Sequence, residues 1–167
     1  MKLKEYAILA LVIIGLLTVS CSCAQKSCPD IGSAAPNFSL ESTDGSSVSL
    51  KDFKGSKVMV NLWSTRCVPC VSEMPHIQAI HEKWADKGLK ILAVNVSDNA
   101  QKAGQFASDN GFTFTILSDP KGQMFQTFCL QQVIPITLFI DEEGILKAKK
   151  LGAFSSVEEI ETILNSL

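Results

Sequence analysis

The chain has 167 residues, of which 46% are hydrophobic and 19% are charged, and its formal net charge is −2 at pH 7. This length suits one domain with its own hydrophobic core. The nearly balanced charge offers no basic surface, so a nucleic-acid partner is not expected. The six cysteines are too few and too unevenly spaced for a small fold held together by disulfides alone.

The N-terminus has the pattern of an export segment. Two lysines precede an uncharged apolar run from Tyr6 to Val19, and small polar residues follow this run. Three outcomes are open: lipid attachment at Cys21 in "LTVSC", cleavage of a signal peptide after Ala24, or an uncleaved membrane anchor. Two of these outcomes would hold a bacterial, extracytoplasmic domain on the outer face of the cytoplasmic membrane.

The chain is therefore divided into three parts. Residues 1–24 are expected to be a signal peptide or membrane anchor, residues 25–31 a polar tether, and residues 32–167 the folded domain.

The first half of the domain begins with strands. An Asp-Gly turn between two alternating segments predicts a hairpin over residues 37–50, and "KVMVNLW" at 57–63 is typical of a fully buried strand. From Cys67 the apolar residues recur at steps of three and four, which predicts a helix that ends at Gly88 and is kinked at Pro75.

The second half alternates strands and helices. The patterns predict a strand at 89–96, a helix at 99–110, a short extended piece at 112–119, one or two helical turns at 121–128, an antiparallel hairpin at 136–152, and a last helix opened by a capping box of Ser155 and Glu158. Strand–helix alternation makes the sheet parallel in its centre, and the closing hairpin adds antiparallel strands. We expect an α/β fold with a mixed central sheet flanked by helices and an added N-terminal β-hairpin.

The cysteine pair in "WSTRCVPC" (63–70) is the strongest chemical signal. A zinc site needs four ligands, whereas one pair is present here, and His76 and His81 do not share a helix face. A structural disulfide between Cys67 and Cys70 would close too small a loop to constrain the unfolded chain. No metal and no cofactor is therefore expected, and redox chemistry is the favoured interpretation.

A strand-to-helix junction suits such chemistry. The helix N-terminus would stabilise a thiolate at Cys67, and the cation of Arg66 would act in the same direction. The thiolate can attack a substrate disulfide, and Cys70, one turn along, can then release the reduced substrate. A pair of this kind beside a βαβ pattern is typical of a thioredoxin-like redox site.

Several segments that follow one another along the chain support the same interpretation. The chain resembles the TlpA/ResA-like group of membrane-anchored thiol-disulfide oxidoreductases, in the thioredoxin superfamily with a redoxin (AhpC/TSA-like) domain, over about residues 30–167. The matching segments are "GSAAPNFSL", "VNLWSTRCVPCVSEMP", "ILAVNVSD" and "VIPITLFIDEEG". The resemblance implies a thioredoxin-like fold.

The resemblance also implies roles for individual residues. Cys67 would be the nucleophile and Cys70 the resolving thiol. Pro135 would be cis and face this pair, so that a substrate backbone could pair with Ile134. Glu73 matches an acidic residue that tunes the cysteine pKa values or relays a proton; a solvated carboxylate on the helix face is the alternative.

Three further positions have two interpretations or depart from the pattern. Trp63 would pack beneath the active site as part of a substrate-binding region, or would only fill the core. Arg66 stands before the first cysteine, where an aromatic residue is usual. It either contacts the substrate and favours acidic substrates, or is a solvated charge beside the site. Asn61 stands where cytosolic thioredoxins have an aspartate that acts as a base, and an amide cannot take that role.

The other cysteines have simpler expectations. Cys129 is expected to be a buried free thiol, although a third redox thiol remains open, and Cys23 and Cys28 are expected to be tether residues.

These observations predict an extracytoplasmic thiol-disulfide oxidoreductase that reduces protein disulfides. The family analogy adds apocytochrome c as a substrate, hence a role in cytochrome c maturation, together with a membrane electron donor upstream. A peroxiredoxin-like peroxide reductase and a copper-binding redoxin-fold module are the alternatives from other functional classes.

Overall fold

The computed structural model describes residues 28–167, so the expected export segment, including Cys21, lies outside the described residues. The elements follow one another in this order: β1 Ser39–Ser42, β2 Ser47–Ser49, η1 Leu50–Phe53, β3 Val58–Trp63, α2 Val68–Lys83, η2 Ala85–Lys87, β4 Lys90–Asn95, α3 Ala100–Asp109, β5 Thr115–Ser118, α4 Gln123–Thr127, β6 Ile136–Ile140, β7 Leu146–Leu151 and α5 Val157–Leu164. Within this part of the chain, no helix is long and apolar enough to cross a membrane.

One mixed sheet of seven strands organises the domain, in the order β2-β1-β5-β4-β3-β6-β7. The central strands β5, β4 and β3 run parallel, and β6 and β7 join antiparallel beside β3. The N-terminal hairpin of β1 and β2 is attached antiparallel to β5. This is the thioredoxin-like α/β architecture expected from the sequence, including the added hairpin.

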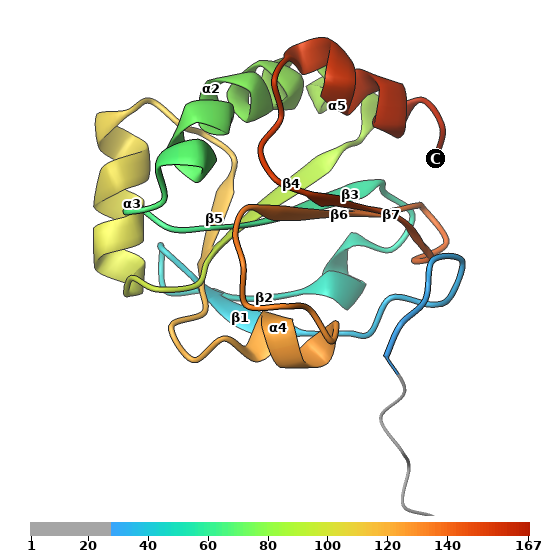
Figure 1. The fold of residues 1–167 in the computed structure, drawn as a ribbon, viewed down its shortest axis with the longest axis horizontal. Coiled ribbons are helices and arrows are strands. Elements are labelled where there is room, and N and C mark those ends of the chain that lie inside the picture. Colours follow the sequence, from blue (N-terminus) through green and yellow to red (C-terminus); the bar gives the residue numbers. More distant parts are fainter. Residues whose placement is uncertain (1–27) are drawn as a thin grey trace, which may run out of the picture.

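Helices cover both faces of the sheet (Figure 1). On one face α2, α3 and α5 enclose a core that includes Met59, Trp63 and Phe139. On the other face α4 and η1 pack over a second core that includes Val60, Leu62 and Leu138. Successive residues of β3 therefore face opposite layers, and every residue of this strand is buried, as predicted.

Some boundaries differ from the predictions. The piece at 112–119 contains a true sheet strand, β5, because Leu92–Asn95 of β4 and Glu41–Ser42 of β1 pair with its two edges. The long helix ends at Lys83, and η2 bridges the gap to Gly88, which adopts φ 76°. The predicted capping box of Ser155 and Glu158 does not form. The N-cap of α5 is Ser156, whose hydroxyl accepts from the backbone N–H of Glu159, and the Glu159 carboxylate accepts from the N–H of Ser155.

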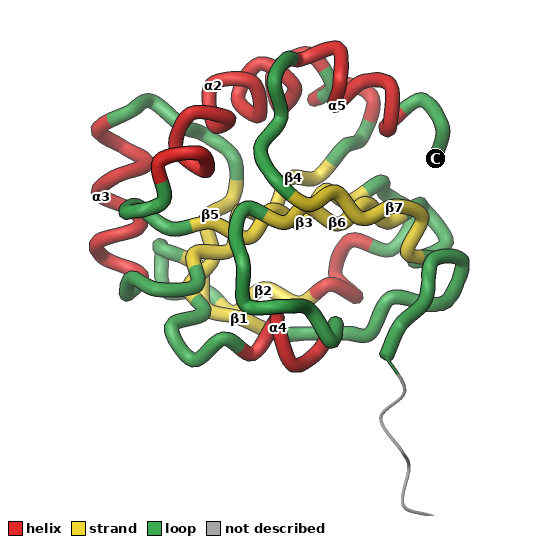
Figure 2. The backbone as a smooth tube through the Cα atoms, viewed as in Figure 1, coloured by secondary structure: helices red, strands yellow, loops and turns green. Residues whose placement is uncertain are grey.

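A second disulfide corrects the expectations for two cysteines. Cys28 and Cys129 are joined, with their Cα atoms 5.5 Å apart, and both residues are exposed. Cys129 is therefore not a buried free thiol, and the last residues of the predicted tether are fixed to the domain. The tube in Figure 2 shows the first described residues running along this side of the domain, near the loop after α4.

Candidate active site

The nucleophile candidate lies at the start of α2. Cys67 is the N-cap residue of this helix, and the backbone N–H of Cys70 donates a hydrogen bond to its sulfur at 3.3 Å. Pro69 occupies the first turn, where its missing N–H costs nothing. The sulfur atoms of Cys67 and Cys70 form a disulfide. Once reduced, Cys67 would have unpaired helix N–H groups beside it, which favour its thiolate.

The two cysteines differ in exposure. Cys67 is partly exposed, whereas Cys70 is fully buried. A nucleophile must be reached by its target and a resolving thiol must be protected from other targets, so the exposure agrees with the order of attack inferred from the sequence.

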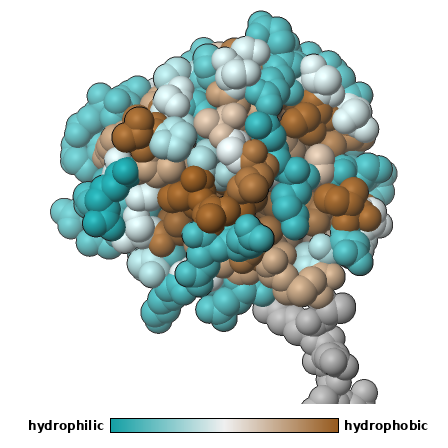
Figure 3. All heavy atoms as spheres, viewed as in Figure 1, coloured by the Kyte–Doolittle hydropathy of each residue, from teal (hydrophilic) through white to brown (hydrophobic). Residues whose placement is uncertain are grey.

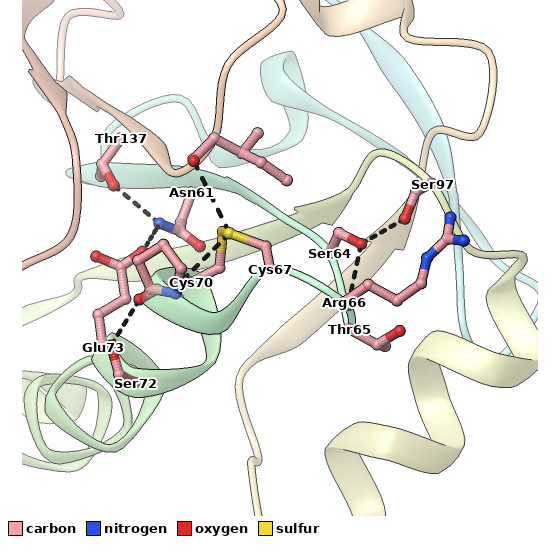
Figure 4. The surroundings of a disulfide bond; sticks show 12 residues. Asn61, Ser64, Thr65, Arg66, Cys67, Cys70, Ser72, Glu73, Ser97 and Thr137 are labelled. Atoms are coloured by element: carbon pink, nitrogen blue, oxygen red, sulfur yellow. Dashed lines mark hydrogen bonds between the residues drawn. A yellow bond between two sulfur atoms is a disulfide. The ribbon is translucent and has the colours of Figure 1, made fainter.

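The loop before β6 forms the second wall of the site. The Ile134–Pro135 peptide bond is cis, and the carbonyl oxygen of Ile134 lies 3.8 Å from the sulfur of Cys67 (Figure 4). Pro135 is buried and Ile134 is partly exposed. The backbone next to this carbonyl is therefore within reach of a chain that binds at Cys67.

Glu73 is buried beneath the pair rather than solvated on the helix face. It lies three residues after Cys70, on the same side of α2, and neither residue is exposed. One carboxylate oxygen accepts a hydrogen bond from the side-chain amide of Asn61 at 2.8 Å, and the other accepts from the backbone N–H of Phe154 at 2.8 Å. The same amide donates to the hydroxyl of Thr137 at 2.9 Å.

This environment shifts the carboxyl group toward its neutral form. Burial raises the pKa of Glu73 above its ordinary value of 4.5, and the hydrogen bonds from Phe154 and Asn61 offset only part of the rise. A carboxyl group with a raised pKa can exchange a proton closer to neutral pH than an ordinary one. Asn61, which has no proton to exchange, serves instead as a donor that orients this carboxylate.

A second buried carboxylate holds the loop in front of Cys67. Asp98, just after β4, accepts hydrogen bonds from the backbone N–H and the hydroxyl of Thr65 and is ion-paired with Lys102. Burial alone would raise the pKa of Asp98, but the hydrogen bonds from Lys102, Thr65 and Asn95 outweigh burial and lower it to about 2. The hydroxyls of Ser64 and Ser97 add a hydrogen bond between the same two loops.

The remaining predicted residues lie around this centre in different roles. Trp63 is fully buried and packs on Phe106, with ring centroids 5.5 Å apart, so it supports the site but cannot touch a substrate. Its assignment as a substrate-binding residue is therefore wrong. Arg66 is exposed beside Cys67, where it can meet a partner.

Sequence reasoning missed several members of the site. Thr137, Phe154 and Asp98 are far from the cysteines along the chain. The sheet brings Thr137 and Asp98 close, and the loop between β7 and α5 supplies Phe154. One signal was present for Asp98, since a polar residue directly after a buried parallel strand lies at the same sheet edge as the end of β3. No group of three or more His, Cys, Asp or Glu side chains that could hold a metal occurs within residues 28–167.

Comparisons with known proteins agree with this geometry. The sequence pattern of the AhpC/TSA family matches residues 31–149. The thiol-disulfide oxidoreductase ResA of Geobacillus kaustophilus is 34% identical over 143 residues, which cover 86% of this chain and 81% of the relative. The thioredoxin-like protein YneN of Bacillus subtilis is 36% identical over 130 residues, which cover 76% of this chain and 75% of the relative.

Solved structures give the same result. The thioredoxin domain of a thiol-disulfide oxidoreductase from Bacteroides vulgatus superposes with a TM-score of 0.71 and 26% identity, covering 81% of this chain and 99% of the other. A DsbF homologue from Corynebacterium diphtheriae superposes with a TM-score of 0.73 and 28% identity, covering 81% and 87%. The chain belongs to the AhpC/TSA family, within the ResA-like thiol-disulfide oxidoreductases of the thioredoxin superfamily.

Proposed function

We propose that this thiol-disulfide oxidoreductase reduces protein disulfides outside the cytoplasm, with Cys67 and Cys70 as its working pair. The observation that carries the proposal is the position of Cys67. It caps α2, is a partly exposed residue, and has its sulfur 3.8 Å from the Ile134 carbonyl oxygen in the cis-proline loop. Once reduced, a thiol in this position can be reached by an extended substrate chain.

The reaction proceeds in two exchanges. The thiolate of Cys67 attacks one sulfur of the substrate disulfide, the substrate S–S bond breaks, and the second substrate sulfur leaves as a thiolate that takes up a proton. The thiolate of Cys70 then attacks the sulfur of Cys67, which releases the first substrate sulfur as a second thiol. The substrate gains two electrons and two protons, and the protein is left with the Cys67–Cys70 disulfide.

Glu73 is suited to proton transfer in the second exchange. Cys70 is buried and must lose its proton before it can attack. Glu73 lies one turn further along the same face of α2, and its raised pKa lets it hold a proton at a higher pH than an ordinary glutamate does. We propose that it moves the proton of Cys70, in place of the base that Asn61 cannot be.

The location outside the cytoplasm has two supports. Residues 1–24 have the sequence pattern of an export segment, with Cys21 as a lipidation site or an uncleaved helix as the anchor. The Cys28–Cys129 disulfide would persist in an oxidising compartment and is unusual in the cytosol. In that location, a thiol donor at the outer face of the cytoplasmic membrane would re-reduce the Cys67–Cys70 pair. We propose apocytochrome c as the substrate.

A reduction assay tests the core of the proposal. The full-length protein, kept reduced by a dithiol, should reduce 2-hydroxyethyl disulfide and insulin, and Cys67→Ser should lose this activity by at least about 10³-fold. Activity retained in that variant would refute the working pair. Peroxide consumption measured in the same preparation distinguishes the peroxidase alternative, and labelling of intact cells with a membrane-impermeant maleimide tests the location.

A further inference from the structure

The surface is hollowed on the side of Cys67 that faces away from the cis-proline loop. The hollow has a volume of about 330 Å³ and lies between the first turn of α2 and α3. It is lined by Thr65, Arg66, Val68, Val71, Ser72 and Phe106. In the space-filling view, apolar side chains reach the surface over the start of α2, beside α3 (Figure 3).

The hollow is next to the nucleophile. Val68 follows Cys67 directly and is 81% exposed, although a valine gains nothing from contact with water. Val71 lies one turn above Cys67, and its N–H donates to the Cys67 carbonyl at 3.0 Å. Cys67 is therefore flanked by the Ile134 carbonyl on one side and by this apolar hollow on the other.

The floor of the hollow packs against the core of the domain. Phe106 is half-buried on α3 and packs against the fully buried ring of Trp63, at 5.5 Å between ring centroids. A fixed aromatic floor under exposed valines suits a side chain that enters from outside, because little conformational freedom is lost when the side chain binds.

The rim of the hollow carries a free cation. Arg66 is exposed and forms no ion pair with any residue between 28 and 167. Its side chain extends away from Cys67, toward Ser97 and α3 (Figure 4). A guanidinium that no carboxylate of its own domain neutralises is available to an anionic partner.

We propose that this hollow is a specificity subsite for an acidic, apolar stretch of the polypeptide substrate. An apolar side chain beside the attacked cysteine fills the hollow, and a neighbouring Asp or Glu pairs with Arg66. Arg66 and Val68 both line the hollow and are the two sequence neighbours of Cys67, so both contacts are expected close to the attacked cysteine. The inference rests on the proposed reductase function and names the class of substrate that this function would act on.

Three disulfide-bridged peptides test the subsite. They differ only in the two residues beside the first cysteine, which are Glu-Phe, Lys-Phe or Glu-Ser, and kcat/KM is measured with the full-length reduced protein. The Glu-Phe peptide should exceed Lys-Phe by about threefold, the scale of an exposed ion pair. It should exceed Glu-Ser by about fivefold, because a phenyl group buries more apolar area than a hydroxymethyl group.

Two variants assign these preferences to the subsite. Arg66→Glu should reverse the preference for Glu-Phe over Lys-Phe, and Val68→Ser should reduce the preference for Phe over Ser. Ratios between peptides are compared within each variant, so a change in the reactivity of Cys67 itself cancels. Lys54→Glu, an equal charge change beyond η1 at the other end of β3, should leave both ratios as in the parent.

The outcomes separate the subsite from the function on which it rests. A protein that reduces 2-hydroxyethyl disulfide but treats the three peptides alike overturns the subsite and leaves the reductase function standing. A protein that reduces neither the small disulfide nor any peptide overturns both. Preferences that persist in Arg66→Glu and Val68→Ser would also overturn the subsite.

Discussion

Two disulfides in the described part of the chain make a useful contrast. Their Cα atoms are almost equally far apart, at 5.2 and 5.5 Å, but Cys67–Cys70 spans 3 residues and Cys28–Cys129 spans 101. A crosslink stabilises a fold mainly by restricting the unfolded chain, and the restriction grows with loop length. The short disulfide therefore contributes little stability and can be opened and closed, whereas the long one is suited to holding the domain together.

The surroundings of the two disulfides support the same distinction. Cys67 caps a helix of sixteen residues and has a buried partner above a buried carboxyl group. Cys129 follows the short helix α4 in a left-handed conformation, φ 48°, and both cysteines of its disulfide are exposed. The first site favours a thiolate and controls access to it, and the second has neither property.

The largest effect is expected from breaking the short disulfide. Cys70→Ala should leave the attack by Cys67 intact and remove its resolution, so multiple turnover should fall by at least about 10³-fold while a mixed disulfide accumulates. Mass spectrometry after incubation with a disulfide peptide would detect that adduct. Continued turnover by this variant would mean that another thiol resolves the intermediate.

Breaking the long disulfide should lower stability and leave the activity nearly unchanged. The double variant Cys28→Ser, Cys129→Ser should lose about 4–5 kcal/mol of unfolding free energy, the entropic value for a loop of this length, and should keep its rate with 2-hydroxyethyl disulfide within about twofold. Urea unfolding of the parent and the variant measures the first quantity. Equal stability would show that the bond does not constrain the unfolded chain, and a large loss of rate would give it a part in the reaction.

The contrast also shows what the sequence could predict. The motif at 63–70, the β-rich run of β3 and the Pro135 segment are local signals, and each led to a correct element. The Cys28–Cys129 bond, by contrast, joins a polar segment to a loop 101 residues away, and connectivity of this kind leaves no mark in the local pattern. The burial of Glu73 is likewise decided by α5 and by the loop that supplies the Phe154 N–H, and neither is visible from the sequence of α2.

An intermediate effect is expected at Asp98, which holds the loop before the short disulfide. Its pKa is lowered from 3.8 to about 2, which corresponds to about 2 kcal/mol of stability at about 1.4 kcal/mol for each pH unit. Because the folded pKa is lowered, this stability is present above pH 3.8 and is lost as the pH falls toward 2. Asp98→Asn should therefore be about 2 kcal/mol less stable than the parent at pH 7, and the gap should narrow below pH 4.

Urea unfolding at pH 7, 4 and 2.5 measures this gap. Asp109→Asn, an exposed carboxylate at the end of α3, is the matched control and should change stability little at any of these pH values. If the difference in unfolding free energy between Asp98→Asn and the parent stayed constant with pH, the negative charge of Asp98 would contribute nothing to stability. The explanation by its ionised carboxylate would then be wrong.

The smallest effect on stability is expected at Glu73, below the short disulfide. Its dependence on pH has the opposite sign to that of Asp98. Its pKa is raised by burial, so the folded state favours the neutral carboxyl group. The stability from that preference is fully present below pH 4.5 and is lost as the pH rises through the raised pKa. Glu73→Gln cannot ionise, so its stability relative to the parent should increase from pH 4 to pH 8.

The size of this increase is limited by the hydrogen bonds around the carboxylate. Asn61 and Phe154 each donate to one oxygen, and both donors favour the ionised form that burial disfavours. Urea unfolding of the oxidised protein measures the effect without the redox reaction, and Glu82→Gln, on the exposed side of the same helix, is the control. If the relative stability of Glu73→Gln fell with rising pH, the two hydrogen bonds would dominate over burial, Glu73 would be ionised at neutral pH, and it could not carry the proton of Cys70.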